Sequence, residues 1–261
     1  MSFFSGVERP EPVVISPWLR IALLTLWLGG MFTIVANRER WKARAHPERP
    51  ARIMAAILLL DQIVLYAWQF GSGYFNLPVS LPLYHCRISV PFLILDLLFG
   101  VKALRSIWIY WGLLGSVFAM GFMDLYRFDF PHYTNFQFFI VHILLGWVII
   151  YTIFVLDYRF DRKNLVKTLV VTLVYNVFLI GINAWGNGSF IPYRGALYNY
   201  GYVTLPPPSL HEVVLSMWPG LYYIIMLLGY EVLILIQYGF GRVLNRVADR
   251  EAEQRAGEGN A

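Results

Sequence analysis

The stretch Ser80-Leu81-Pro82-Leu83-Tyr84-His85-Cys86-Arg87-Ile88-Ser89 opens an apolar run and holds the only cysteine of the chain. An imidazole, a guanidinium and a hydroxyl lie within three residues of that thiol. Inside a bilayer each of these polar groups needs a protein partner, because lipid tails offer none. The stretch therefore predicts a membrane helix whose first turns face a polar chamber.

The composition of the whole chain is typical of a membrane protein. Of 261 residues, 58% are apolar and only 14% are charged, whereas soluble domains carry about a quarter charged residues. The net charge is +5, but the basic residues gather in short connectors, which is a topology signal rather than a nucleic-acid-binding patch. We therefore expect membrane lipids as partners and no nucleic acid, and the sequence leaves the oligomeric state open.

Seven apolar segments are long enough to cross a bilayer, which needs about 20 helical residues. They cover residues 15–37, 53–74, 81–100, 107–123, 135–156, 165–185 and 213–239. This pattern predicts an all-α protein, a seven-helix transmembrane bundle over residues 15–240. An N-terminal segment (1–14) precedes it, and a charged tail (241–261) that we expect to fray follows it. The loop over residues 186–212 is long enough to act as a lid.

The basic residues also predict the orientation of the bundle. Sixteen of the 21 Lys and Arg lie in the tail or in the connectors after the first, third and fifth segments. The positive-inside rule places these regions in the cytoplasm, with the N-terminus outside and the C-terminus inside. The N-terminus has no basic n-region, so we expect no cleaved signal peptide.

Polar residues of four segments fall at one depth near the outer surface. At 1.5 Å per residue, Cys86 and His142 lie about 10 Å from the outer ends of their helices. Gln69 and Asn183 lie close to the outer ends of theirs. Such polar groups must point into the bundle rather than toward lipid. On the third segment, helical spacing gives a common face to Cys86, Ser89, Leu93 and Asp96.

Three carboxylates, Asp61, Asp96 and Glu231, form a deeper layer by the same arithmetic. We expect no Lys or Arg at their depth, so each must be protonated, hydrogen-bonded or hydrated. They could fix helix register or relay protons, which makes a proton- or ion-coupled transporter an alternative function. The absence of an internal repeat counts against that alternative. A non-catalytic lipid-binding membrane protein is a third possibility.

The candidate residues also have plain structural explanations. A lone cysteine packs as a small hydrophobe, and a histidine or asparagine in a membrane often joins two helices by a hydrogen bond. Metal-ligand atoms are present on His85, Cys86, His132 and His142, but no HxxxH or CxxC spacing connects them. We therefore expect no metal and no cofactor.

The opening stretch resembles the YwaF-type bacterial integral membrane proteins, which have a Leu-Pro-Leu-x-x-Cys-x-Ile-Ser motif at the start of a helix. The likeness continues at Phe130-Pro131-His132-Tyr133 and in the run ending at His142, and it covers roughly residues 53–240. That bacterial family is similar to the eukaryotic transmembrane protein 164 family, whose members are described as phospholipid acyltransferases that use a Cys and a His. The resemblance thus implies a multi-pass protein of a bacterial plasma membrane.

Carried onto this chain, the resemblance implies Cys86 as nucleophile and His142 as base. A thiolate attacks an acyl ester and forms a thioester, which a second lipid or water then resolves. Arg87 departs from the small polar residue of the bacterial motif, and its charge favours the thiolate. We therefore expect a Cys–His lipid acyltransferase or lipid hydrolase that acts at the outer leaflet.

Supporting roles follow from the same chemistry. Gln69, Asn183 or backbone N–H groups could hold the oxyanion of the intermediate. His85 or His132 could carry protons in place of His142. The sequence does not identify the donor lipid, the acceptor lipid or the balance between transfer and hydrolysis.

Overall fold

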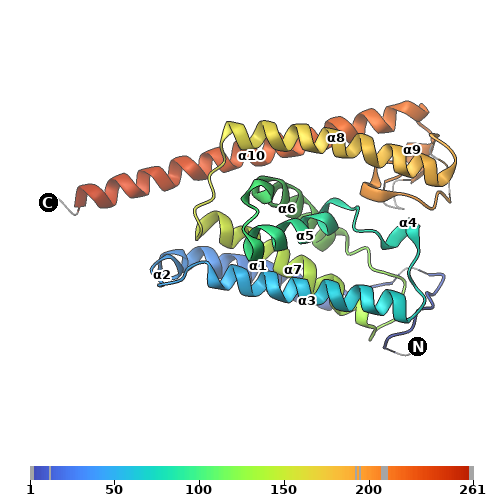
Figure 1. The fold of residues 1–261 in the computed structure, drawn as a ribbon, viewed down its shortest axis with the longest axis horizontal. Helices are drawn as coiled ribbons and strands as arrows, with labels where there is room; N and C mark the ends of the chain where they lie inside the picture. Colours follow the sequence, from blue (N-terminus) through green and yellow to red (C-terminus); the bar gives the residue numbers. More distant parts are fainter. Residues whose placement is uncertain (1–2, 12, 192, 194, 207–210, 259–261) are drawn as a thin grey trace. The chain divides into compact units, whose positions relative to one another are not determined.

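The computed structural model of the chain describes residues 3–11, 13–191, 193, 195–206 and 211–258. All regular structure in these residues is helical, which confirms the predicted all-α class (Figure 1). The helices are α1 (Pro17–Ala36), α2 (Arg38–Lys42), α3 (Arg49–Gly71), α4 (Leu77–Ser80), α5 (His85–Phe99), α6 (Arg105–Phe122), α7 (Tyr133–Phe154), α8 (Arg162–Asn187), α9 (His211–Leu215) and α10 (Pro219–Glu258). Two 3-10 turns, η1 (Lys102–Leu104) and η2 (Tyr200–Tyr202), lie between them.

Six helices of the described residues are long and apolar enough to cross a membrane, where the sequence predicts seven. They are α1, α3, α6, α7, α8 and α10. The remaining segment is α5, whose 15 residues span about 22 Å, less than the roughly 30 Å of a bilayer core. It is short because Tyr84 before it is extended, with ψ 143°, and Gly100 ends it in the left-handed region at φ 80°.

The chain divides into two compact units, residues 1–157 and 158–261, and each is described by itself. In the first unit α7 packs against α1, α3 and α6, while α5 packs against α3 and α6. Helix α3 runs antiparallel to α7. The Gln137 amide donates to the Asp61 carboxylate at 2.9 Å toward one end, and the Tyr151 hydroxyl donates to the Pro47 carbonyl at 2.8 Å toward the other.

Helix α6 lies between α5 and α7 and runs antiparallel to both. Cys86 at the start of α5 packs on Gly115, and Asp96 near its end is hydrogen-bonded to Arg105. The Ser116 hydroxyl donates to the His142 carbonyl, while Gly112, one turn before Ser116, packs against later residues of α7. The helices α3 and α6 are therefore parallel, and the chain returns from one to the other through α5.

The N-terminal segment lies along one end of this unit, where α3 ends and α7 begins. We call residues 3–9 the strap, and this end of the unit the strap end. The Trp68 indole donates to the Phe4 carbonyl at 3.2 Å, and the Tyr74 hydroxyl donates to the Glu8 carboxylate at 2.6 Å. Arg9 forms an ion pair with Asp129. Nothing in the sequence of residues 1–14 indicates that they hold the helix ends together.

The second unit is built on α8 and α10, which pack side by side and antiparallel (Figure 1). Phe160, just before α8, exchanges hydrogen bonds with Asn245 late in α10. Helix α10 begins at Pro219 rather than at the predicted residue 213, because residues 216–218 interrupt the helix. It then continues as a helix to Glu258, through most of the charged tail predicted over residues 241–261.

Candidate functional site

Arg87 organises the local structure at the start of α5. Its guanidinium donates to the Val79 carbonyl at 2.6 Å, an acceptor at the end of α4 that has no helical partner. It also donates to the Tyr126 hydroxyl and lies 5.3 Å from the ring centroids of both Tyr84 and Tyr126. These contacts fix the turn from α4 into α5, and they place a positive charge beside the thiol.

Cys86 is the second residue of α5 and is half-buried against α6. A Cβ added to Gly115 would lie 2.3 Å from the Cys86 Cβ, so only glycine permits this approach. The first backbone N–H groups of α5 have no acceptor within the helix. The thiol therefore lies at a helix N-terminus, where amide dipoles stabilise negative charge.

His142 lies on α7 with its orientation fixed by its own helix. Its Nδ1 is 2.7 Å from the Phe138 carbonyl and donates to it, which leaves the lone pair on Nε2. The ring is 8% exposed. The Ser116 hydroxyl donates to the His142 carbonyl at 2.7 Å. Because Gly115 meets Cys86, consecutive residues of α6 bring Cys86 and His142 to one level.

The remaining supporting residues of this unit have distinct surroundings. Gln69 is fully buried on α3, and its side-chain amide forms no hydrogen bond with the described residues. The His85 ring is buried in an edge contact with Trp111, 5.1 Å between centroids.

His132 caps the N-terminus of α7 and ties it to the strap. Its Nδ1 accepts from the Thr134 backbone N–H at 3.3 Å, and its Nε2 donates to the Ser5 carbonyl at 3.0 Å. Burial lowers the pKa of His132 below its usual value. The ring stacks on Phe128 with 4.0 Å between centroids. Both ring nitrogens of His132 are thus used in contacts that hold the strap end together.

Asn183 belongs to the second unit, so its predicted part in a four-helix site stays a prediction. Its amide donates to the Tyr200 carbonyl and its oxygen accepts from the Tyr200 N–H, both at 3.0 Å. Asn187 clasps Tyr198 in the same way. The described part of the loop over residues 186–206 is therefore fixed to α8 by two asparagines.

Two expectations about the three acids are wrong: that Asp96 has no basic partner, and that Asp61 lies deeper than the candidate site. Asp96 does have a basic partner: Arg105 donates to both its carboxylate oxygens at 2.7 and 2.8 Å, and the Trp108 indole adds a third bond at 2.9 Å. The sequence places Arg105 in a loop, but α6 begins at that residue, and its long side chain reaches back to α5.

Asp61 is not deep relative to the candidate site. It accepts from Gln137, the fifth residue of α7, whereas His142 is the tenth. Asp61 therefore lies closer to the strap end than His142, because α3 begins at Arg49 and not at residue 53. Glu231, on α10, has a buried carboxylate oxygen without a hydrogen-bond partner among the described residues.

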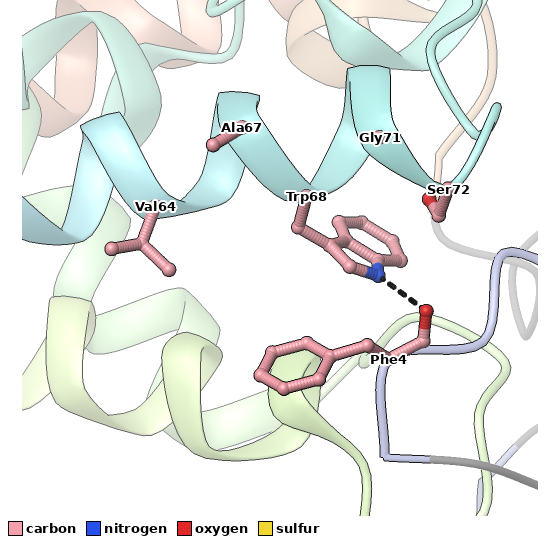
Figure 2. A pocket seen from close by; sticks show the side chains of 6 residues that line it. All are labelled: Phe4, Val64, Ala67, Trp68, Gly71 and Ser72. Carbon is pink, nitrogen blue, oxygen red and sulfur yellow. Dashed lines mark hydrogen bonds between the residues drawn. The ribbon is translucent and has the colours of Figure 1, made fainter.

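A pocket of about 310 Å³ lies between α3 and the strap. Val64, Ala67, Trp68 and Gly71 form one face of α3 toward it, and Phe4 closes the other side (Figure 2). None of the predicted site residues lines this pocket. Over the described residues, no group of three or more His, Cys, Asp or Glu side chains is placed to hold a metal ion.

Sequence reasoning missed the residues of α6 that join the site. Gly112 and Ser116 form a small-x-x-x-small pattern toward α7, which permits close helix packing in membranes. That pattern in residues 107–123 was the available signal. Tyr126, which binds Arg87, lies in a loop and gave no signal.

Comparison with known proteins identifies one family. The model of the TMEM164 family matches residues 4–239, nearly the whole chain, and confirms the resemblance to that family. The likeness to YwaF-type proteins stays a prediction. No curated protein and no solved structure matches the chain.

Proposed function

The chain belongs to the TMEM164 family and is a multi-pass membrane protein, and we propose that it transfers or hydrolyses lipid acyl chains through Cys86 and His142. One observation carries the proposal. Cys86 packs against Gly115 of α6, and the hydroxyl of the next residue, Ser116, donates to the His142 carbonyl. The two candidate residues therefore lie at the same height along α6.

The proposed reaction has two steps. The His142 Nε2 takes the thiol proton while the Cys86 sulfur attacks the ester carbonyl of a lipid, and collapse of the tetrahedral intermediate expels the lipid alcohol, which receives that proton. The acyl thioester on Cys86 is then attacked by a second lipid alcohol or by water, with His142 again as base. The thiol is regenerated and the acyl group leaves on its acceptor.

The surroundings of Cys86 explain why a base is needed. A cysteine is mostly a neutral thiol near neutral pH and reacts as the thiolate, so its proton must be removed, while its place at the helix N-terminus beside Arg87 stabilises the negative charge that results. A neutral His142 with its Nδ1 proton held by Phe138 is the tautomer that can accept the thiol proton. His85 is a proposed alternative proton carrier.

We propose two sources of donors for the oxyanion of the intermediate. The buried Gln69 amide has no hydrogen bond with the described residues, and the first N–H groups of α5 lack helical acceptors. Donors held ready in this way are the usual source of such stabilisation.

We propose the seven-span topology with the N-terminus outside and the C-terminus in the cytoplasm. The parallel direction of α3 and α6 supports it, because the chain must recross the unit through α5 to connect them. The strap end is then the outer face, and the basic connector around α2 lies inside. This puts the reaction at the outer leaflet of a plasma membrane, which we propose to be bacterial.

The transporter alternative keeps two of its three acids. Asp96 is bonded to Arg105 and Trp108, so it is a structural anion rather than a mobile proton carrier. Asp61 and Glu231 stay available to that alternative. A lipid-composition assay alongside an ion-flux assay separates the two functions.

The test is to trap the acyl-enzyme in the full-length protein. The protein is reconstituted in vesicles of phospholipid with a labelled acyl chain, and its intact mass is measured before and after hydroxylamine. We expect one acyl adduct on Cys86, none in Cys86→Ala, and a rate at least about 100-fold lower in His142→Gln. His46→Gln, a histidine change outside the site, is the matched control. An adduct in Cys86→Ala equal to wild type excludes the proposal.

A further inference from the structure

The end of the second unit at which α8 begins is held together by contacts with α10. We call this antiparallel pair of helices the hairpin. Phe160, just before α8, packs against Gly241 and exchanges hydrogen bonds with Asn245. Arg159 donates to the Asn245 carbonyl and forms an ion pair with Asp249. The first turn of α8 therefore lies beside this stretch of α10, and the proposed reaction uses none of these residues.

Four basic side chains at this level are exposed and form no ion pair with a described residue. They are Arg162, Lys163, Arg242 and Arg246. Two carboxylates nearby are already in use. Asp161 caps α8 and accepts from the Asn164 backbone N–H and side-chain amide at 2.8 and 2.6 Å. Asp249 is the partner of Arg159. This end of the hairpin thus carries an excess of positive charge.

Three of the four basic residues lie on one side of the hairpin. Arg242 and Arg246 each come one position after an inward-facing residue of α10, so each is turned about 100° from the interface. Arg162 comes three positions before the inward-facing Leu165, which turns it about 60° in the same rotational sense. Because the helices face each other and run antiparallel, that common sense brings the three arginines to the same side. Lys163 is turned about 160° and points away from α10.

Exposed apolar side chains continue from the arginines along the same side. On α8 they follow Arg162 by four and eleven residues, and on α10 they precede Arg242 by seven and fourteen, so they keep the faces of the two arginines. They are Val166, Leu173, Leu235 and Leu228, each between 46% and 61% exposed. The stripe runs for at least about 15 Å, half the hydrocarbon core of a bilayer.

We infer that this side of the hairpin binds an anionic phospholipid, with the headgroup phosphate at Arg162, Arg242 and Arg246 and the acyl chains along the apolar stripe. Guanidinium groups bind phosphate through paired, charge-assisted hydrogen bonds. Basic side chains at the membrane ends of helices are typical contacts of anionic headgroups.

The occupant is a lipid rather than a free phosphate, because only a lipid has chains that cover the apolar stripe below the arginines. In the proposed topology this lipid belongs to the cytoplasmic leaflet. The inference is independent of the proposed acyl transfer, because it uses only the second unit.

The test is native mass spectrometry of the full-length protein in detergent micelles. The protein is titrated with phosphatidylglycerol or with phosphatidylcholine of the same acyl chains, and the bound lipid is counted. A basic residue near an anionic lipid changes the affinity by about fivefold, so we expect phosphatidylglycerol to bind at least about tenfold more tightly. Added inorganic phosphate should not displace it, and full displacement would overturn the assignment to a lipid.

Variants identify the side of the hairpin that binds. Arg162→Gln and Arg242→Gln should each weaken phosphatidylglycerol binding by about fivefold and leave phosphatidylcholine binding unchanged. Lys163→Gln is the matched control: it removes the same charge beside Arg162, but from a side chain that points away from α10, so it should keep the wild-type affinity. Equal affinity of wild type for the two lipids, or an equal loss in Lys163→Gln and Arg162→Gln, overturns the inference.

Discussion

Two acids of the same chain lie in opposite surroundings. Asp96 near the end of α5 is bonded to Arg105 through both oxygens and to the Trp108 indole. Glu231 on α10 keeps a buried oxygen without a partner among the described residues. The difference separates a polar group that holds two helices together from one that the described residues leave partly unpaired. The first unit holds both kinds of polar group as well: Arg87 at the start of α5 is bonded to Val79 and Tyr126, whereas the buried Gln69 amide on α3 forms no hydrogen bond with the described residues.

The largest loss of stability is expected from removing a polar group whose hydrogen bonds are all made. Asp96→Ala leaves the Arg105 guanidinium without its acceptor and should lower the free energy of unfolding by about 3–5 kcal/mol. Denaturant unfolding of the detergent-solubilised protein measures it. Glu231→Ala is the comparison, because it removes a carboxylate whose buried oxygen has no hydrogen-bond partner among the described residues, and it should cost clearly less. Equal losses for the two acids would break the distinction.

A smaller effect is expected from the close approach of α5 and α6. Gly115→Ala places a methyl group 2.3 Å from the Cys86 Cβ, so the helices must separate, at a cost of about 1–3 kcal/mol. Acyl-enzyme formation should fall with it, since the thiol moves away from α7. Gly121→Ala, on the same helix but with nothing within 4 Å of the added Cβ, is the control and should keep full activity. If both variants behave alike, the contact does not position the thiol.

The smallest effect is expected from pH at the strap end. Burial lowers the pKa of His132 below its ordinary value of 6.5, so the neutral ring is the form that supports the fold. Its contribution is present above about pH 6.5 and is lost as pH falls and Nδ1 takes the proton that prevents it from capping α7. The size is that of a helix cap, about 1 kcal/mol.

Unfolding of wild type and His132→Asn between pH 5 and 8 checks this. The difference in stability between the two proteins should shrink toward pH 5, because asparagine also caps a helix but does not titrate. A difference that stays constant over this range would contradict the assigned tautomer.

The sequence predicted most of the helices because long apolar runs leave few alternatives. It placed the polar face of α5 correctly, since Ser89, Leu93 and Asp96 are buried as helical spacing requires. The ion pair between Arg105 and Asp96 was not predicted. Arg105 begins α6 and its side chain reaches back to α5, and helical periodicity gives no sign of a contact between two helices. The strap was also missed, because the bonds of Phe3, Phe4 and Ser5 to the helices are accepted by backbone carbonyls, which carry no residue preference.

The central claim is that His142 acts as a base on the Cys86 thiol. Since Cys86 is the only cysteine of the chain, iodoacetamide labelling reports on that thiol alone. The measurement is the rate of labelling from pH 5 to 9 in full-length wild type and His142→Gln. The account predicts fast labelling of wild type near neutral pH and a rate at least about tenfold lower in His142→Gln at the same pH. Identical pH profiles for the two proteins would contradict it.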